Sequence, residues 1–203
     1  MAADDLAAIS GKLKSVKMGI VGYGVVRLND TEADARKVFE VAKKLKAKNI
    51  VVDPSSDSMA LLDKLATEYN IKVAIVNGKK GSAYADPDAL LNLLASRSDH
   101  VGTCVVLGDY AASGFNALDA VKKLGKRVIE LHLTDVDEHG NQVPLGTGVV
   151  HADRVLEYLK QQNFKGIFVV EYDSDNGPET ANNFFLSVNY FSEIVGHLAG
   201  THQ

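Results

Sequence analysis

The chain has 203 residues, a formal net charge of −4 and 46% hydrophobic residues. This length suits one domain with a buried core, and we expect a single domain over residues 1–203. The acidic balance disfavours nucleic acid as a partner, because no excess of lysine and arginine is available to replace the counterions of a phosphate backbone.

Cysteine usage and hydropathy bear on the compartment. The single cysteine, Cys104, lies in an apolar run, which predicts a small buried core residue in a reducing environment. No apolar run approaches the roughly 18 residues of a membrane span, and residues 1–5 lack the apolar stretch of a signal peptide. We therefore expect a cytoplasmic protein without a membrane partner.

Apolar residues recur at helical spacing in several segments, which predicts amphipathic helices. These segments are residues 5–15, 31–46, 57–69, 86–96, 116–125, 152–162 and 178–198. Short β-branched runs between them predict six strands, at residues 17–26, 49–53, 72–77, 101–107, 128–135 and 166–171. This alternation predicts right-handed βαβ crossovers and a parallel sheet.

Two local patterns refine the first helices and strands. Thr31 and Asp34 resemble a capping box, which predicts a helix start at residue 31. Gly22 and Gly24 suggest a dinucleotide-binding loop, but Arg27 stands where the third glycine of that loop is needed. Close backbone approach at a strand end is the favoured interpretation.

Polar residues follow the predicted strands. Ligands of parallel α/β folds bind at the carboxyl ends of the strands, so these residues are site candidates. The candidates are Asp53, Asn77, Lys79, Asp109, His132, Asp135 and Glu171. Each also has a simpler explanation: His132 and Glu171 can be hydrogen-bonded structural residues, Asp53 and Asp109 solvated loop carboxylates, and Lys79 part of a mobile basic loop.

Six short motifs occur in a fixed order along the chain. They are Val-Val-Asp53-Pro, Val-Ala-Ile-Val76-Asn77, Gly102-Thr-Cys-Val-Val106-Leu-Gly108-Asp109-Tyr110, His132-Leu-Thr-Asp135, Pro144-Leu-Gly-Thr-Gly148-Val-Val and Val170-Glu171-Tyr172. In this order and spacing they resemble the sugar phosphate isomerase/epimerase family, the xylose-isomerase-like TIM barrels. The resemblance extends over nearly the whole chain.

That resemblance implies an α/β fold, a parallel (β/α) barrel. The family's barrel has eight strands and holds one divalent metal, commonly Mn, Mg, Zn or Co, on Glu, Asp, His and Glu. The same glutamates move a proton α to a sugar carbonyl. The resemblance implies that this chain starts at the second helix of the barrel and supplies strands three to eight. We therefore expect a truncated barrel of about six strand–helix units.

The resemblance also identifies the metal ligands, of which half are retained. His132 matches the family histidine and Glu171 the last glutamate, whereas the expected glutamate and aspartate are Val76 and Val106. The histidine of the family's sixth-strand motif has become Asp109. Because one imidazole and one carboxylate hold hard divalent cations poorly, we expect a weak metal site or none.

Two functions remain open. The first is a divergent sugar or sugar phosphate isomerase/epimerase with catalytic residues His132, Glu171 and Asp109 and substrate-binding residues Asp53, Asn77, Lys79 and Asp135. The second is an inactive barrel remnant that binds carbohydrate or dimerises. Because a six-stranded piece of a barrel exposes two strand edges, we also expect either a smaller closed barrel or a homodimer.

Overall fold

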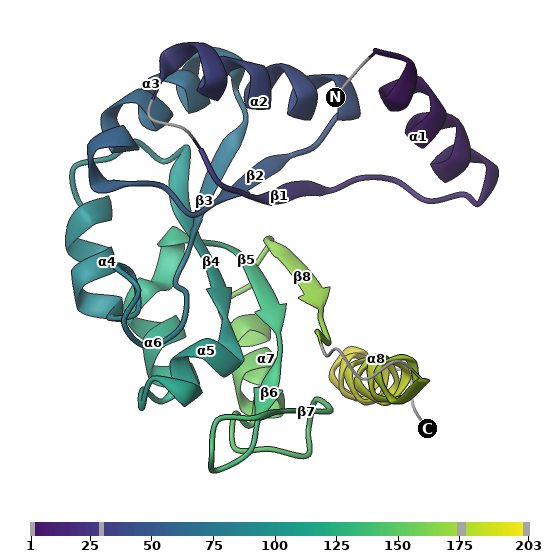
Figure 1. The fold of residues 1–203 in the computed structure, drawn as a ribbon. Coiled ribbons are helices and arrows are strands. Elements are labelled where there is room, and N and C mark those ends of the chain that lie inside the picture. Colours follow the sequence, from purple (N-terminus) through teal and green to yellow (C-terminus); the bar gives the residue numbers. More distant parts are fainter. Residues whose placement is uncertain (1–2, 29–30, 174–177, 201–203) are drawn as a thin grey trace. The chain divides into compact units, whose positions relative to one another are not determined.

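The structure is a computed structural model that describes residues 3–28, 31–173 and 178–200 (Figure 1). The strands of its main sheet lie in the order β1-β2-β3-β4-β5-β8. They are β1 (Gly22–Val26), β2 (Asn49–Val52), β3 (Lys72–Val76), β4 (Val101–Val106), β5 (Val128–Leu133) and β8 (Ile167–Val170). The pairs β1–β2, β2–β3 and β5–β8 are parallel, as the strand–helix alternation predicts. A short antiparallel pair, β6 (Asp135–Val136) and β7 (Gln142–Val143), follows β5.

Helices alternate with the strands. They are α1 (Ala3–Ser15), α2 (Glu32–Leu45), α3 (Met59–Tyr69), α4 (Pro87–Leu94), α5 (Leu107–Ala112), α6 (Ala117–Leu124), α7 (Ala152–Gln161) and α8 (Pro178–Ala199), with 3-10 turns η1 (Ser56–Ser58) and η2 (Gly125–Arg127). All the predicted helices are present. The additional one is α5, which begins directly after β4, where the sequence indicated only an exit turn. None of the helices in the described ranges has the length and hydropathy needed to cross a bilayer.

The chain divides into two compact units. The first consists of Met1–Val76 and Leu93–Thr103, and the second of Asn77–Asn92 and Cys104–Gln203. The first unit holds β1, β2, β3 and the start of β4. The second holds the end of β4 together with β5 and β8.

In the first unit, α2 and α3 cover β2 and β3 with fully buried side chains such as Phe39, Leu62 and Ile75. The Asp34 N–H donates to Thr31 Oγ1 over 3.2 Å, which confirms the predicted cap of α2. A Cβ on Gly24 would lie 2.5 Å from the Val51 carbonyl oxygen. Close packing of β1 on β2 therefore explains this glycine, as predicted.

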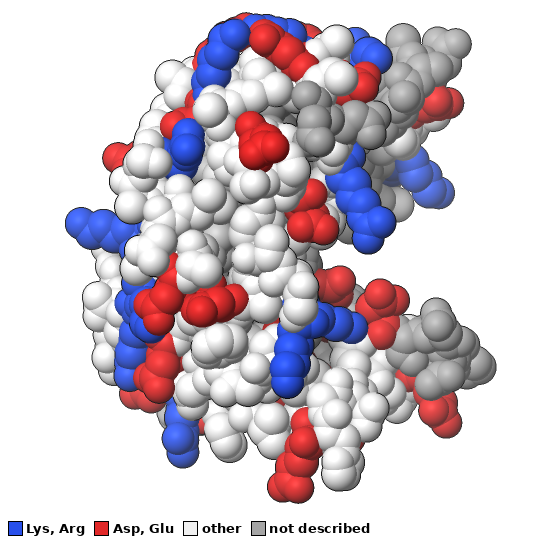
Figure 2. Space-filling view, turned by 60° about the vertical axis from the view of Figure 1, so that its left-hand side comes forward, with Lys and Arg blue, Asp and Glu red and all other residues white. Residues whose placement is uncertain are grey.

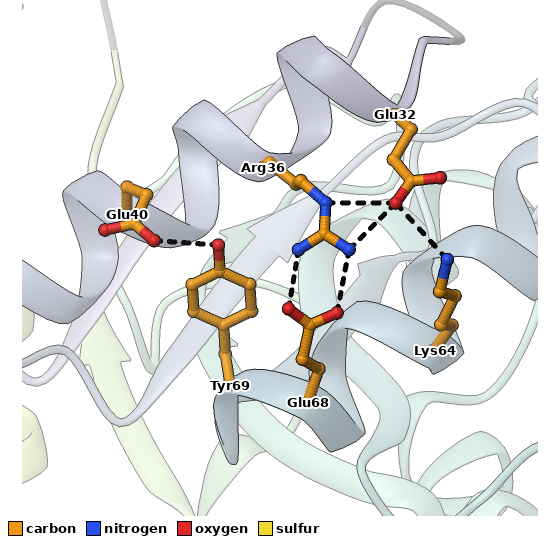
Figure 3. Close-up of polar contacts among 6 residues, drawn as sticks. All are labelled: Glu32, Arg36, Glu40, Lys64, Glu68 and Tyr69. Atoms are coloured by element: carbon orange, nitrogen blue, oxygen red, sulfur yellow. Dashed lines mark hydrogen bonds and ion pairs between the residues drawn. The ribbon is translucent and has the colours of Figure 1, made fainter.

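An ion-pair network joins α2 to α3 on the surface of the first unit (Figure 3). Arg36 Nη1 and Nη2 donate to the two carboxylate oxygens of Glu68 over 2.6 and 2.8 Å, and Nε donates to Glu32 over 2.9 Å. Lys64 donates to the same Glu32 oxygen, and the Tyr69 hydroxyl donates to Glu40. The two-pronged geometry fixes how the helices align, although solvent screens its energy.

In the second unit, β5 divides its side chains between two faces. Leu131 and Leu133 are fully buried, whereas Glu130 and His132 point to the opposite face because successive residues of a strand alternate. Helix α6 begins at Asn116, whose side chain accepts the Asp119 N–H over 3.0 Å, as predicted. An ordinary apolar core thus supports a strand that carries two ionisable side chains.

Helix α8 differs from the prediction. Its expected inward face, Phe184, Val188, Phe191 and Val195, is only partly covered, and Phe184 and Val195 count among the exposed large hydrophobic residues. Phe185 and Leu186 are 63% and 48% exposed. The reason is that α8 packs on α7 and β8 along one side, where a cavity of about 290 Å³ remains, lined by Leu156, Phe164, Phe168 and Leu198 among others.

The ends of the sheet bear on the predicted assembly. Within the described residues, β1 pairs only with β2 and β8 only with β5. The expectation of either a smaller closed barrel or a homodimer stays a prediction, because these two edges belong to different units. Both edge strands keep backbone groups that no strand of the described chain covers.

Candidate active site

The candidate site centres on His132 of β5. Glu130 precedes it by two residues and shares its face of the strand, and Cys104 lies on β4, next to β5 in the sheet. Glu171 follows the end of β8, and its N–H donates to the Leu133 carbonyl oxygen over 3.4 Å. Parallel pairing of β5 and β8, with His132 opposite Val169, brings these side chains together.

Both ring nitrogens of His132 contact carboxylates. Nε2 lies 2.7 Å from Glu130 Oε1, and Nδ1 lies 2.7 Å from Glu171 Oε2. A neutral imidazole carries one N–H, so it can donate to only one of two carboxylates, whereas an imidazolium donates to both. The side chains of Glu130 and His132 are 4% and 12% exposed, and that of Glu171 is 41% exposed. The arrangement is a buried cation between an inner and an outer carboxylate.

The pKa values of His132 and Glu171 follow from these contacts. Burial lowers the pKa of His132, but the hydrogen bonds to Cys104, Glu130 and Glu171 outweigh burial and raise that pKa to about 12. The hydrogen bond from His132 lowers the pKa of Glu171 against the opposing effect of burial. Glu171 is therefore held as a carboxylate at the solvent side of the histidine.

Asp109 lies in the first turn of α5 and is partly buried. Burial raises the pKa of Asp109 above its ordinary value. The positive charge of Lys79 opposes this rise, and the negative charge of Glu171 adds to it. These interactions place Asp109 within electrostatic range of both Lys79 and Glu171. The pKa values of the two carboxyl groups move in opposite directions, which is the pattern of an acid and a base sharing one site.

The predicted site residue Asn77 has a structural role. It is fully buried; its amide Nδ2 donates to the Val106 carbonyl oxygen over 3.3 Å, and its Oδ1 accepts the Val106 N–H over 2.7 Å. These bonds fix the end of β4, and the predicted substrate contact of Asn77 stays a prediction.

Asp135 is also buried, with 1% exposure, and its carboxylate holds the following loop. Oδ1 accepts the N–H groups of Val136 and Val150, and Oδ2 accepts those of Gly146 and Gly148. A Cβ on Gly148 would collide with Asp135 itself, which explains the glycine of the Pro144–Val150 motif. The carboxylate is thus used within the fold, and the predicted contact with substrate stays a prediction.

The other predicted residues occupy surface positions. Lys79 is exposed in the segment after β3, in the same unit as His132, Asp109 and Glu171. Asp53 is exposed at the end of β2, in the first unit, where its N–H donates to the Val26 carbonyl oxygen.

Sequence reasoning missed two members of this site, Glu130 and Cys104. Cys104 is buried as predicted, but it lies beside His132 rather than in a purely apolar setting. The signal for Glu130 was its position two residues before His132, since an ionisable residue within a buried strand shares the face of its i+2 neighbour.

The metal centre implied by the family resemblance does not fit these residues. The side chains of Val76 and Val106 offer no lone pair, so His132 and Glu171 are the two family ligand positions that keep a donor atom. Hard cations need several oxygen ligands, which this set does not supply. Within the described ranges, the group able to hold a metal is a different one: Cys104, Glu130 and His132, whose ligand atoms lie within 4.8 Å of one another.

Residues 32–185, more than half of the chain, match the family described as xylose isomerase-like TIM barrel. The chain belongs to this family. Its strand order, with helices between the strands, is that of an incomplete barrel of this type. No curated protein matches the sequence significantly.

Solved structures of this barrel type resemble the chain closely in fold and distantly in sequence. A xylose isomerase domain protein from Planctomyces limnophilus matches with a TM-score of 0.80 and 15% identity, over 98% of this chain and 86% of its own. A D-tagatose 3-epimerase-like protein gives 0.77 and 19%, over 97% and 86%. An IOLI protein with a binding zinc atom gives 0.75 and 18%, over 97% and 82%. At these identities the likeness establishes the fold.

Proposed function

We propose that this protein is a divergent sugar or sugar phosphate isomerase/epimerase that moves a proton α to a carbonyl. The observation that carries the proposal is the position of Glu171 at the end of β8, 2.7 Å from Nδ1 of His132 and in electrostatic interaction with Asp109 of α5. The pKa values of Glu171 and Asp109 are shifted in opposite directions, which supports the roles of base and acid. Membership of the xylose isomerase-like family and the epimerases among the similar structures support the substrate class.

In the proposed reaction, Glu171 accepts the proton from the carbon next to the carbonyl, and that C–H bond breaks. Protonated Asp109 donates its proton to the carbonyl oxygen, which gives an enediol. Return of a proton to carbon gives the isomer or epimer and restores both carboxyl groups. His132 is a positioning residue here, since it fixes Glu171 through Nδ1. Lys79 supplies positive charge for a phosphate or hydroxyl of the substrate.

The test is solvent deuterium exchange into a panel of ketoses, aldoses and their phosphates, followed by NMR. We expect exchange with at least one substrate, and a loss of about 10²-fold or more in Glu171→Gln and in Asp109→Asn. Glu138→Gln, a change of an exposed carboxylate in the turn between β6 and β7, is the matched control and should keep its rate. Absence of exchange with the entire panel would refute the proposal.

The alternative is an inactive barrel remnant, which Val76 and Val106 favour because they replace two polar family positions. Calorimetric binding of a sugar without exchange of its α-proton would support it over the enzyme. In either case we propose a small-molecule partner. The net charge of −4 supports this, as does the face drawn in Figure 2, where lysine and arginine are interspersed with acidic residues. The buried thiol of Cys104 further supports a cytoplasmic location.

We also propose a homodimer. Two observations in the second unit support it: β8 is an edge strand, and α8 beside it exposes Phe184, Phe185 and Leu186. An exposed apolar helix surface next to the open edge of a strand favours aggregation of a monomer, and a second copy of the chain would cover both.

A further inference from the structure

We propose that Cys104 Sγ, His132 Nε2 and the carboxylate of Glu130 form a binding site for Zn²⁺ or Co²⁺. This set differs from the family positions in two of its three ligands, Cys104 and Glu130. The inference goes beyond the proton transfer proposed above and does not depend on it.

The first argument is geometric. The three ligand atoms lie within 4.8 Å of one another on neighbouring strands, β4 and β5. Zinc bonds of about 2.0–2.3 Å at tetrahedral angles set ligand atoms roughly 3.5 Å apart. Glu130 Oε1 and His132 Nε2, now 2.7 Å apart, need to separate by less than about 1 Å to accept an ion between them. Three protein ligands leave the fourth position of zinc for water or substrate.

The second argument is the choice of donors. A thiolate, an imidazole and a carboxylate form a mixed S, N, O set, which suits borderline-soft Zn²⁺ and Co²⁺ and not the hard cations Mg²⁺, Mn²⁺ or Ca²⁺. The loss of oxygen ligands at Val76 and Val106 removes the family site for hard cations. It does not affect the donor atoms of Cys104, Glu130 and His132.

The third argument is burial. Cys104 is fully buried and the Glu130 side chain is 4% exposed, so these two ligand positions lie almost entirely out of contact with water. Limited access of solvent favours retention of an ion bound between these side chains.

The fourth argument is the partner of the opposite ring nitrogen. Glu171 Oε2 lies 2.7 Å from Nδ1 of His132, so Nε2 faces the proposed metal while Nδ1–H donates to a carboxylate. Metal-binding histidines are commonly held in this way, by a carboxylate that fixes the tautomer and the ring orientation. Glu171 thus orients the ligand without binding the ion.

The test is titration of the untagged, reduced full chain with Co²⁺ alone. We expect stoichiometric binding with a thiolate-to-cobalt charge-transfer band in the near ultraviolet, and its loss when Zn²⁺ is added. Because Cys104 is the only cysteine of the sequence, the band reports on this residue alone. Cys104→Ser should abolish the band, Glu130→Gln should weaken binding at least tenfold, and Glu171→Gln should keep the band with 10–100-fold weaker affinity.

Glu138→Gln is the control and should bind Co²⁺ as the wild type does, because Glu138 is exposed in the turn between β6 and β7, outside the three ligands. Far-ultraviolet circular dichroism checks that each variant is folded, and the wild-type spectrum decides the question without any variant. Absence of binding, or binding without the sulfur band, would overturn the proposal. The second result would place the ion on His132 and Glu171 instead. The deuterium-exchange assay is read separately, so failure of either proposal is distinguishable from failure of the other.

Discussion

Replacing Asp135 by asparagine should destabilise the second unit more than any comparable change of a loop carboxylate. Asp135 accepts four backbone N–H groups, from Val136, Gly146, Gly148 and Val150, over 2.9–3.1 Å. Each of its oxygens accepts two of them. An asparagine keeps the shape and one oxygen, but its NH₂ group then faces two N–H donors.

The expected loss follows from this count. Hydrogen bonds to charged groups contribute about 1.5–3 kcal/mol each, and buried donors left without an acceptor cost about 1–3 kcal/mol. Two donors left without an acceptor, at about 1–3 kcal/mol each, give a decrease of about 2–6 kcal/mol in the free energy of unfolding.

The measurement is urea denaturation followed by circular dichroism. Asp137→Asn is the matched control, since Asp137 also accepts N–H groups, from His139 and Asn141, but on an exposed loop. We expect a clearly smaller shift of its midpoint. A loss below about 1 kcal/mol for Asp135→Asn would refute the view that this carboxylate organises the loop.

Three further predictions concern the first unit and the assembly. Arg36 lowers the pKa of Glu68 below its ordinary 4.5, so this ion pair stabilises the fold above pH 4.5 and its contribution is lost as the pH falls further. In Arg36→Gln, the free energy of unfolding should therefore decrease less steeply below pH 4.5 than in the wild type. Gly24→Ala should cost about 1–3 kcal/mol, measured by urea denaturation, because its Cβ meets the Val51 carbonyl; an unchanged midpoint would contradict the close packing. Phe185→Glu should convert the proposed dimer into a monomer in light scattering, and a wild-type monomer would refute that proposal.

The sequence predicted the fold well because its signals are local. Helix caps such as Thr31 and Asn116 and the strand–helix alternation determine the elements without knowledge of distant contacts. The partnership of His132 with Glu171 was also predictable, as one of the open alternatives, since parallel neighbours deliver their ends to one edge.

What could not be predicted depends on contacts between distant segments. Asn77 and Asp135 look like binding residues because they follow strands, and only the structure shows that backbone groups occupy their polar atoms. The exposure of α8 has the same origin, because its sequence shows an apolar stripe but not how much of it β8 and α7 can cover. Glu130 could be recognised as a member of the site only when its neighbours in space, Cys104 and His132, were known.

The hydrogen bonds between Asp135 and the loop at residues 145–150 limit how the length of this region can vary between related chains. Gly146, Gly148 and Val150 are tied to one carboxylate, and the Leu145 N–H is tied to Ser187 of α8. Insertions within residues 145–150 would break these ties, whereas the hairpin of β6 and β7 can lengthen at its tip without touching them. Length polymorphism should therefore concentrate around residues 138–141, while the contacts of Asp135 stay constant.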